Sequence, residues 1–396
     1  MLKKLFKSRK NKAEFVSKID CLVPKFNNKV LFVVKDKTCF SGNIRVSLES
    51  FIKYSDKKIY FYKDGNIKQE IWDELKQLGV TPLKQFTLYS LWHILSSKTV
   101  IFSHNPRDAH ITKKCKNRNI INLWHGVAIK KIELLMSKID IQKKQLLLNN
   151  SKLYSMVIAS SKEDQKTNAK AFGASLGKVK ITGLPRYEIL KEGYQASNYL
   201  KKELENIKQI KNGKKLVLYA PTFRENSQSP LKIIKDDEWK LINNFAKKNN
   251  IIFGIRPHPY DENRMENIVK KYNNLYMFNS KDFVETNLLL KYVDLLVVDF
   301  SSIWIDYLLL NRPIIGFSKD YSHYLENERG FVYNIEKVFP ETFIDNIESL
   351  LKEIEHKFNT REIFSYQKAL SLFHTYNLDF DFKKKIFEEI EKLDKQ

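Results

Sequence analysis

Short apolar runs alternate with longer amphipathic stretches along most of the chain. Residues 29–35, 58–64 and 98–104 are short apolar runs, and each run predicts a buried strand. Stretches such as 44–54 and 69–79 instead repeat their apolar residues every three to four positions, as a helix with one buried face does. This alternation of strands and helices predicts an α/β protein with parallel sheets.

The alternation runs twice, which predicts two domains. A chain of 396 residues is also too long for one ordinary core. We expect an N-terminal Rossmann-like domain over residues 1–190, a lysine-rich linker over 191–213, a C-terminal Rossmann-like domain over 214–370 and a helical tail over 371–396. The simplest architecture is two doubly wound domains that face each other across a cleft.

The formal net charge of +23 indicates an anionic partner, either nucleic acid, a membrane surface or a phosphorylated substrate. A general preference for lysine is the alternative explanation. The basic residues are spread along the chain rather than gathered in a recognised module, so we expect no nucleic-acid partner. The first residues combine lysines with Leu2, Leu5 and Phe6, which suits either an anchor on an anionic membrane or a solvated terminus.

The cysteines and the hydropathy suggest a location. Cys21, Cys39 and Cys115 lie far apart without a pairing or metal-binding spacing, which favours a reduced, cytoplasmic protein. No stretch approaches the roughly 20 apolar residues that span a bilayer, and the N-terminus lacks the apolar core of a signal peptide. We therefore expect a cytoplasmic protein, peripheral on the inner face of the cell membrane.

Polar residues follow several predicted strands, where open α/β sheets bind their ligands. In the first domain, His125 follows the strand 119–125 and has the chemistry of a general base near neutral pH. Gly126 permits close approach of a ligand, and Lys130 lies in a helix-like run where it could meet a phosphate. A loop histidine with no role beyond its turn is the alternative.

The second domain has two such motifs near its first strands. The segment "APTFRE" offers Thr222 and Arg224 to an anion after the strand 215–219. The segment "RPHP" holds Arg256 and His258 between prolines that restrict the backbone. These residues suit contact with a pyrophosphate, whereas a rigid turn would explain "RPHP" equally well.

The last motif joins a buried strand to an apolar helix. Asp299 ends the strand, and Ser301 and Ser302 begin the helix, where free N–H groups attract phosphate. Helix capping alone would explain one serine but not the aspartate and both serines. The sequence has no GxGxxG, P-loop, zinc or GxSxG pattern, so we expect no cofactor and no metal site.

Taken together and in order, these motifs resemble one family. "WHGVAIKKI", "APTFRE", "RPHP" and "DLLVVDFSSIWIDYLLLNRPIIGF", followed by "RGFVY", are similar to the CDP-glycerol glycerophosphotransferases, which include the teichoic acid primases and polymerases. The smaller landmarks "IASSKEDQKTNAKAFG" and "ITGLPRYE" agree as well. The resemblance covers roughly residues 30–345 and implies a GT-B-like pair of Rossmann-like domains.

The resemblance also implies a reaction. An acceptor hydroxyl on a lipid-linked glycan or growing polymer would attack the β-phosphorus of a CDP-alditol, and CMP would leave. In that scheme His125 is the acceptor-side base and His258 the donor-side histidine on the pyrophosphate. The remaining residues that the resemblance assigns to substrate are Gly126, Lys130, Thr222, Arg224, Arg256, Asp299, Ser301, Ser302 and Arg329.

Two departures and two alternatives accompany the resemblance. Phe300 replaces the usual tyrosine, and Val127-Ala128-Ile129 replaces a threonine-proline pair beside His125, where we expect an influence on acceptor choice. A GT-B glycosyltransferase that uses a nucleotide sugar would share the fold and the phosphate sites. A non-enzymatic basic protein on a membrane or nucleic acid would keep its function without His125 and His258.

Overall fold

The computed structural model of the chain describes residues 15–16, 18–35, 40–85, 87–225, 227–360 and 366–395. The basic N-terminal segment with Leu2, Leu5 and Phe6 lies outside the described residues. The chain forms two compact units. Unit 1 consists of Met1–Val127, Ile132–Tyr199 and His374–Gln396, and unit 2 of Ala128–Lys131 and Leu200–Phe373.

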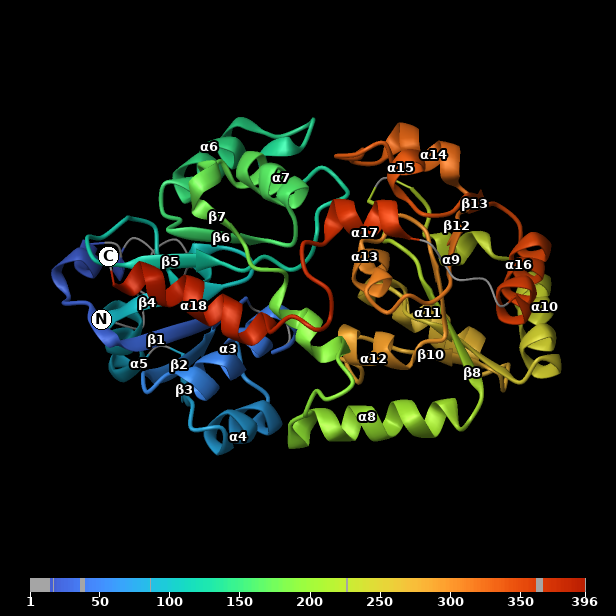
Figure 1. Ribbon diagram of the computed structural model, residues 1–396, viewed down its shortest axis with the longest axis horizontal. Helices are drawn as coiled ribbons and strands as arrows, with labels where there is room; N and C mark the ends of the chain where they lie inside the picture. The colour runs from blue at the N-terminus through green and yellow to red at the C-terminus, as the bar shows by residue number, and fades with distance from the viewer. Residues whose placement is uncertain are drawn as a thin grey trace. The chain divides into compact units, whose positions relative to one another are not determined.

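Unit 1 is built on a seven-stranded sheet in the order β3-β2-β1-β4-β5-β6-β7, with every neighbouring pair parallel. The strands are β1 (Phe26–Val34), β2 (Lys58–Lys63), β3 (Thr81–Leu83), β4 (Ser97–Phe102), β5 (Asn119–Asn122), β6 (Met156–Ala159) and β7 (Val179–Ile181). Its helices are α3 (Gly42–Tyr54), α4 (Gln69–Gln77), α5 (Leu88–Ser96), α6 (Ile141–Ser151), α7 (Lys162–Phe172) and α18 (Phe382–Asp394). Because helices cover the sheet, Val30 to Val34 are all buried (Figure 1).

Unit 2 repeats this plan on a six-stranded parallel sheet in the order β10-β9-β8-β11-β12-β13. The strands are β8 (Lys215–Ala220), β9 (Ile251–Ile255), β10 (Leu275–Met277), β11 (Leu295–Val298), β12 (Ile314–Phe317) and β13 (Phe343–Ile344). The helices are α8 (Asn198–Lys211), α9 (Pro230–Ile233), α10 (Asp236–Lys248), α11 (Glu262–Val269), α12 (Thr286–Tyr292), α13 (Ile303–Leu308), α14 (Tyr321–Asn327), α15 (Ile335–Val338), α16 (Ile347–Asn359) and α17 (Gln367–Phe373).

The strand order explains where ligands can bind. In each sheet the chain first winds outward on one side and then returns to wind outward on the other. The reversal falls between β1 and β4 in unit 1 and between β8 and β11 in unit 2. Connections that diverge at such a point leave a crevice at the carboxyl ends of the strands. The predicted α/β class with two doubly wound parallel sheets is therefore confirmed.

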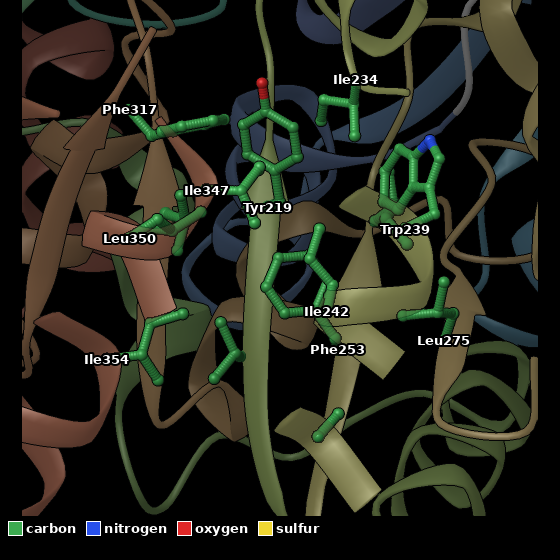
Figure 2. Close-up of a cluster of buried hydrophobic side chains, with 14 of the residues drawn as sticks. Tyr219, Ile234, Trp239, Ile242, Phe253, Leu275, Phe317, Ile347, Leu350 and Ile354 are labelled. Carbon is green, nitrogen blue, oxygen red and sulfur yellow. The ribbon is translucent and has the colours of Figure 1, made fainter. Parts of the chain in front are cut away.

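Large apolar side chains fill the core on one face of the unit 2 sheet. Figure 2 shows Tyr219 of β8 with Trp239 and Ile242 of α10 on one side and Leu350 and Ile354 of α16 on the other. All five are almost fully buried. Full burial of one such side chain contributes about 1.5–3 kcal/mol. The amphipathic periodicity of these two helices thus fixes one side of the sheet.

The unit boundaries differ from the expected domain ranges at two points. The expected linker 191–213 contains α8, which belongs largely to unit 2, where Glu203 accepts hydrogen bonds from the backbone N–H groups of Val284 and Glu285. The expected helical tail 371–396 contains α18, which belongs to unit 1 rather than standing apart. A pattern of local amphipathicity cannot reveal which distant surface a helix covers.

Helix α18 packs against α3 and the short 3-10 helix η5 (Pro185–Leu190) of unit 1 (Figure 1). Its residues Phe382, Ile386 and Ile390 are fully buried. Gly183 has a left-handed φ of 67°, and a Cβ there would lie 2.5 Å from the ring of Phe382. The glycine in "ITGLPRYE" therefore serves the docking of the C-terminal helix.

The sequence predicts unpaired cysteines, and this prediction is wrong, because Cys21 and Cys115 form a disulfide across 94 residues of sequence. Helix α7 is capped by Ser161, whose hydroxyl accepts a hydrogen bond from the N–H of Asp164. In the part of the chain that the structure describes, no helix is long and apolar enough to cross a membrane.

Candidate active site

The turn that carries His125 is strained. Strand β5 ends at Asn122, earlier than the sequence indicates, and Trp124 then adopts a left-handed φ of 47°. A bulky residue rarely takes this conformation and does so only where neighbours hold it. The side chain of Asn122 accepts a hydrogen bond from the Trp124 N–H at 2.9 Å. This backbone conformation turns His125 away from the direction of the strand.

Asn43 and Arg186 hold the same turn from outside. The Asn43 side-chain amide donates to the carbonyl oxygens of Leu123 and Trp124 at 3.0 and 3.1 Å. Its oxygen accepts from the backbone N–H of Arg186 at 3.2 Å. The Arg186 guanidinium donates to the carbonyl oxygen of His125. Neither residue was among the predicted site residues, because they come from α3 and η5, far from His125 in sequence.

The surroundings of His125 favour the neutral form of its ring. Its Nδ1 lies 3.4 Å from the backbone carbonyl oxygen of Ser103, and a carbonyl can only accept, so Nδ1 carries the proton. The unprotonated Nε2 is then the basic atom. The side chain is exposed on one side, yet the protein packed around the rest of the ring withdraws water from it. This desolvation, with the neighbouring His104, lowers the pKa of His125 well below its ordinary value.

His104 is a second histidine in this site that sequence reasoning missed. Its ring stacks on that of His125, with centroids 4.7 Å apart and planes 19° from parallel. The Ser103 hydroxyl lies 2.9 Å from Nδ1 of His104, so Ser103 contacts both rings. Burial lowers the pKa of His104 to about 4. The sequence did hold a clue to His104, because this residue closely follows β4, a strand beside the reversal point of the sheet.

The residues after the turn do not form the expected helix. Ala128 to Lys131 belong to unit 2, where they lie antiparallel to the segment 330–332. The N–H of Lys131 donates to the carbonyl oxygen of Gly330 at 3.0 Å, and the N–H of Val332 donates to that of Ile129 at 2.8 Å. Val127, Ala128 and Ile129 are all buried, so their side chains do not present a surface to an acceptor. The expected direct role in acceptor choice is not supported by this burial.

Lys130 lies among charged residues of unit 2. Its ammonium makes no hydrogen bond or ion pair with any residue in the described ranges, although the side chain is half-buried. Desolvation lowers its pKa, the nearby carboxylate of Asp299 raises it, and the cations Arg329 and Arg224 lower it again. A half-buried cation without a fixed partner is suited to an anionic ligand. The role of Lys130 as a phosphate contact stays a prediction.

His258 follows β9 and is held by aromatic residues. Its Nδ1 accepts a hydrogen bond from the N–H of Tyr260 at 3.4 Å, which leaves Nε2 to carry the proton of the neutral ring. Phe223 stacks on the ring with centroids 4.5 Å apart. Desolvation lowers the pKa of His258, against the opposing effect of Asp261 and Glu262. The neutral ring thus offers an N–H donor, which suits a phosphate oxygen.

The guanidinium of Arg256 is bonded within the protein. It donates to the carbonyl oxygens of Phe278 and Phe283 and, at 2.9 Å, to the hydroxyl of Thr286. These bonds hold the loop before α12 against the end of β9. The predicted contact with a pyrophosphate would require some of these bonds to be exchanged.

Arg224 and Asp299 pair with each other. Arg224 forms a buried ion pair with Asp299 at 2.9 Å and a two-bonded contact with Asp320 at 2.8 and 2.9 Å. Tyr324 covers the guanidinium, whose carbon lies 4.5 Å from the ring centroid. Asp299 also accepts from the N–H groups of Thr222 and Phe300. This network ties the ends of β8, β11 and β12 together beneath the predicted site.

Three hydroxyl groups lie at the reversal point of the unit 2 sheet. Thr222 follows β8, and its buried Oγ1 lacks a hydrogen-bond partner in the described part of the chain. Ser301 and Ser302 follow β11, and Ser302 does not use its side chain to cap α13. Capping therefore does not account for Ser302. Arg329, the last predicted contact, is exposed and paired with Glu225.

The structure thus gathers most of the predicted donor-side residues. Thr222, His258 and Ser301 follow β8, β9 and β11, which are adjacent in the sheet, so they reach its carboxyl edge together. Electrostatic contact of Lys130 with both Asp299 and His258 places it beside them. Among the described residues, no group of three or more His, Cys, Asp or Glu side chains is arranged to hold a metal ion.

Comparison with known proteins gives one family and one fold. Residues 15–392 match the family model described as CDP-Glycerol:Poly(glycerophosphate) glycerophosphotransferase. The teichoic acid poly(ribitol-phosphate) polymerase of Bacillus spizizenii is 27% identical over 353 residues, which are 87% of this chain and 54% of that protein. The chain therefore spans about half the length of that relative.

Two further proteins match over most of their length. The teichoic acid poly(glycerol phosphate) polymerase of Bacillus spizizenii is 25% identical over 393 residues, 95% of each chain. A solved structure of the wall teichoic acid polymerase TagF, soaked with CDPG, has a TM-score of 0.80 at 18% identity. It covers 99% of this chain and 95% of that one, and at this identity the likeness shows the fold.

Proposed function

Because the chain belongs to the CDP-glycerol:poly(glycerophosphate) glycerophosphotransferase family, we propose that it transfers a polyol phosphate from a CDP-alditol to an acceptor hydroxyl. The acceptor oxygen forms a bond to the β-phosphorus, and the bond from that phosphorus to the bridging oxygen breaks. The acceptor proton passes to a base, and CMP leaves. The product is a phosphodiester in a teichoic acid or capsule-like polymer, built on a lipid-linked or polymeric glycan.

The proposal assigns the base to unit 1. His125 is neutral, its Nδ1 proton is held by the Ser103 carbonyl, and its Nε2 has a free lone pair. A base of this kind typically contributes a factor of about 10²–10⁴ to the rate. The stacked His104 and the turn held by Asn43 fix the ring in place. A fixed ring keeps the lone pair in one direction, which a positioned proton transfer requires.

The donor is assigned to unit 2. The single observation that carries this assignment is the convergence of Thr222, His258 and Ser301 at three adjacent strand ends, beside the unpaired ammonium of Lys130. Hydroxyl and N–H donors with one cation match the oxygens of a pyrophosphate. The buried Arg224 network keeps these strand ends together, and so supports the site without direct contact to the ligand.

The test is product analysis with a panel of CDP-alditols. The full chain is incubated with CDP-glycerol or CDP-ribitol and polyol-phosphate acceptors, and released nucleotide and polymer are measured by chromatography and mass spectrometry. We expect CMP and a polyol-phosphate product. Release of a nucleoside diphosphate from a nucleotide sugar would instead favour the glycosyltransferase alternative, and turnover of neither donor class would overturn the proposal.

Substitutions of His125 and His258 distinguish the proposed roles of these two residues. His125→Ala is expected to keep donor affinity within about twofold and to lower CMP release by about 10²-fold or more. His258→Ala is expected to weaken donor binding as well as turnover, because it removes a donor-side N–H group. The exposed His356 of α16 gives a matched control, since His356→Ala removes a surface ring outside both sites. Near-normal turnover of His125→Ala would overturn its role as the base.

A further inference from the structure

Two cations of unit 1 lie at the carboxyl edge of its sheet. Lys35 directly follows β1, where the winding of the sheet reverses, and its side chain is exposed. Arg186 lies in η5, which comes after β7 at the end of the same sheet. The Arg186 guanidinium donates to the backbone carbonyl oxygen of His125, so it lies directly beside the turn that carries this histidine.

The charges of both residues reach the ring of His125. Desolvation and the neighbouring His104 are the larger causes of the lowered pKa of His125, and the charges of Arg186 and Lys35 lower it further. After desolvation, the charge of Lys35 also lowers the pKa of His104. Cations that favour the neutral form of a histidine in this way also attract an anion that comes close to the ring.

Contacts on both sides hold Arg186 in place. Its backbone N–H donates to the side-chain oxygen of Asn43 at 3.2 Å. Its side-chain stem lies against the start of α3, because a Cβ at Gly42 would lie 3.9 Å from Cδ of Arg186. A guanidinium carries several N–H donors in one plane, so the same group can hold the His125 carbonyl and contact a phosphate oxygen. Arg186 is therefore suited to bind an anion at a fixed place relative to His125.

A buried carboxyl, that of Asp164, interacts with the charge of Arg186. It is fully buried and accepts a hydrogen bond from the N–H of Ser160 at 2.8 Å. Burial raises the pKa of Asp164 to about 7, against the effects of this hydrogen bond and of Arg186. Near neutral pH the carboxyl is thus only partly ionised, and it offsets the charge of Arg186 only in part.

We propose that Arg186 and Lys35 bind a phosphodiester of the acceptor, adjacent to the polyol whose hydroxyl His125 activates. The inference rests on the proposed function, in which each transfer leaves a phosphodiester beside the terminal polyol. The next transfer to that polyol brings this anion within a few bonds of the attacking oxygen. Cations beside the base bind and orient such an acceptor, whereas a neutral glycan hydroxyl gains nothing from them. The preferred acceptor is therefore one that already carries polyol phosphate.

The test compares two acceptors that differ in one charge. One is glycerol joined to a short alkyl alcohol by a phosphodiester, and the other is the neutral methyl phosphotriester of the same compound. CMP release from the CDP-alditol is measured for the full chain and its variants with each acceptor. We expect the wild type to favour the diester in kcat/KM by about tenfold or more, as for a charge-assisted hydrogen bond.

The variants assign this preference to the two cations. Arg186→Ala should lose most of it through a higher KM for the diester, and Lys35→Ala should lose part of it. Arg186→Lys keeps the charge and should retain more of the preference than Arg186→Ala. The control is Lys166→Ala, which removes an exposed lysine of α7 and should change neither KM by more than about twofold.

Two kinetic outcomes would overturn the inference. One is an unchanged preference for the diester in both Arg186→Ala and Lys35→Ala. A fall in turnover with both acceptors would then reflect only the lost bond to the His125 carbonyl. The other is a raised KM for the CDP-alditol with an unchanged KM for the diester, which would assign the cations to the donor. The preference is a ratio measured on one protein sample, so a variant that folds incompletely still gives a valid comparison.

Binding of the diester without donor, measured by calorimetry, separates this inference from the proposed function. Absence of CMP release by the wild type with either acceptor would count against the proposed function. In that case tighter binding of the diester by the wild type than by Arg186→Ala would still support the anion site. Equal binding by the two proteins would overturn it.

Discussion

The backbone carbonyl of Ser103 accepts a hydrogen bond from Nδ1 of His125 at 3.4 Å, while the Ser103 hydroxyl lies 2.9 Å from Nδ1 of His104. Ser103, which follows β4, thus fixes the tautomer of His125 and also contacts His104. Because the first contact uses a backbone atom, it does not depend on the identity of residue 103. The arrangement leaves Nε2 of His125 as the basic atom, and in the proposed mechanism the pKa of this ring sets the pH range in which it can accept a proton.

Removal of the stacked ring should move the pH profile of turnover. In His104→Ala more water reaches His125, so the pKa of His125 rises toward its ordinary value of 6.5. A higher pKa means that the base becomes protonated at a higher pH, so the acid limb of kcat/KM should shift upward. His104→Phe keeps a stacked ring and should shift it less. Identical acid limbs in all three proteins would show that His104 does not act on His125.

Replacement of Arg224 should cost stability. Arg224→Met leaves the buried carboxylates of Asp299 and Asp320 without their cation, which typically costs about 3–5 kcal/mol. Urea unfolding measures this loss. Arg224→Lys keeps the positive charge but loses the two-bonded contact with Asp320. Its free energy of unfolding should therefore lie between those of Arg224→Met and the wild type. If both variants unfold like the wild type and only donor binding weakens, Arg224 contacts substrate directly.

Lys130→Ala should weaken donor binding without loss of stability, because the ammonium has no partner among the described residues. Loss of a charge-assisted hydrogen bond of about 1.5–3 kcal/mol corresponds to roughly a tenfold to hundredfold rise in KM for the CDP-alditol. Steady-state kinetics and thermal unfolding measure the two effects. Lys131→Ala, at the next position, is the control. Equal effects of both substitutions on KM would point to a general charge effect.

Glu203 should make folding stability dependent on pH. Burial and the neighbouring Glu285 raise the pKa of Glu203 to about 8. The unfolded chain loses this proton near pH 4.5, so the stabilisation is full below that pH and is lost as pH rises through about 8. Glu203→Gln stays neutral, so its loss of stability between pH 5 and 8.5 should be smaller by on the order of 4 kcal/mol.

Glu205, exposed on the same helix, provides the control for this measurement. Glu205→Gln should follow the wild type at each pH, because its carboxylate is already solvated. Denaturant unfolding at several pH values gives the comparison. Parallel curves for Glu203→Gln and the wild type would show that Glu203 does not retain its proton in the folded state.

The convergence of the proposed donor-side residues could be predicted from sequence because each of them follows a strand within two or three positions. Thr222, His258 and Ser301 each come after an apolar run, and parallel strands deliver such residues to one edge. The partners of these residues could not be predicted. Arg224 carries the same charge whether it binds a phosphate or Asp320, and only the packing decides which anion it meets.

The sequence by itself determined the alternation of strands and helices, the existence of two sheets, and His125 and His258 as the candidate histidines. These follow from hydrophobic periodicity and from polar residues at strand ends, which are local properties of the chain. Only the tertiary structure brought His104 onto His125, moved the Ala128–Lys131 segment into unit 2 and returned α18 to unit 1. Such contacts join residues that are distant in sequence, and they depend on which buried surfaces fit together.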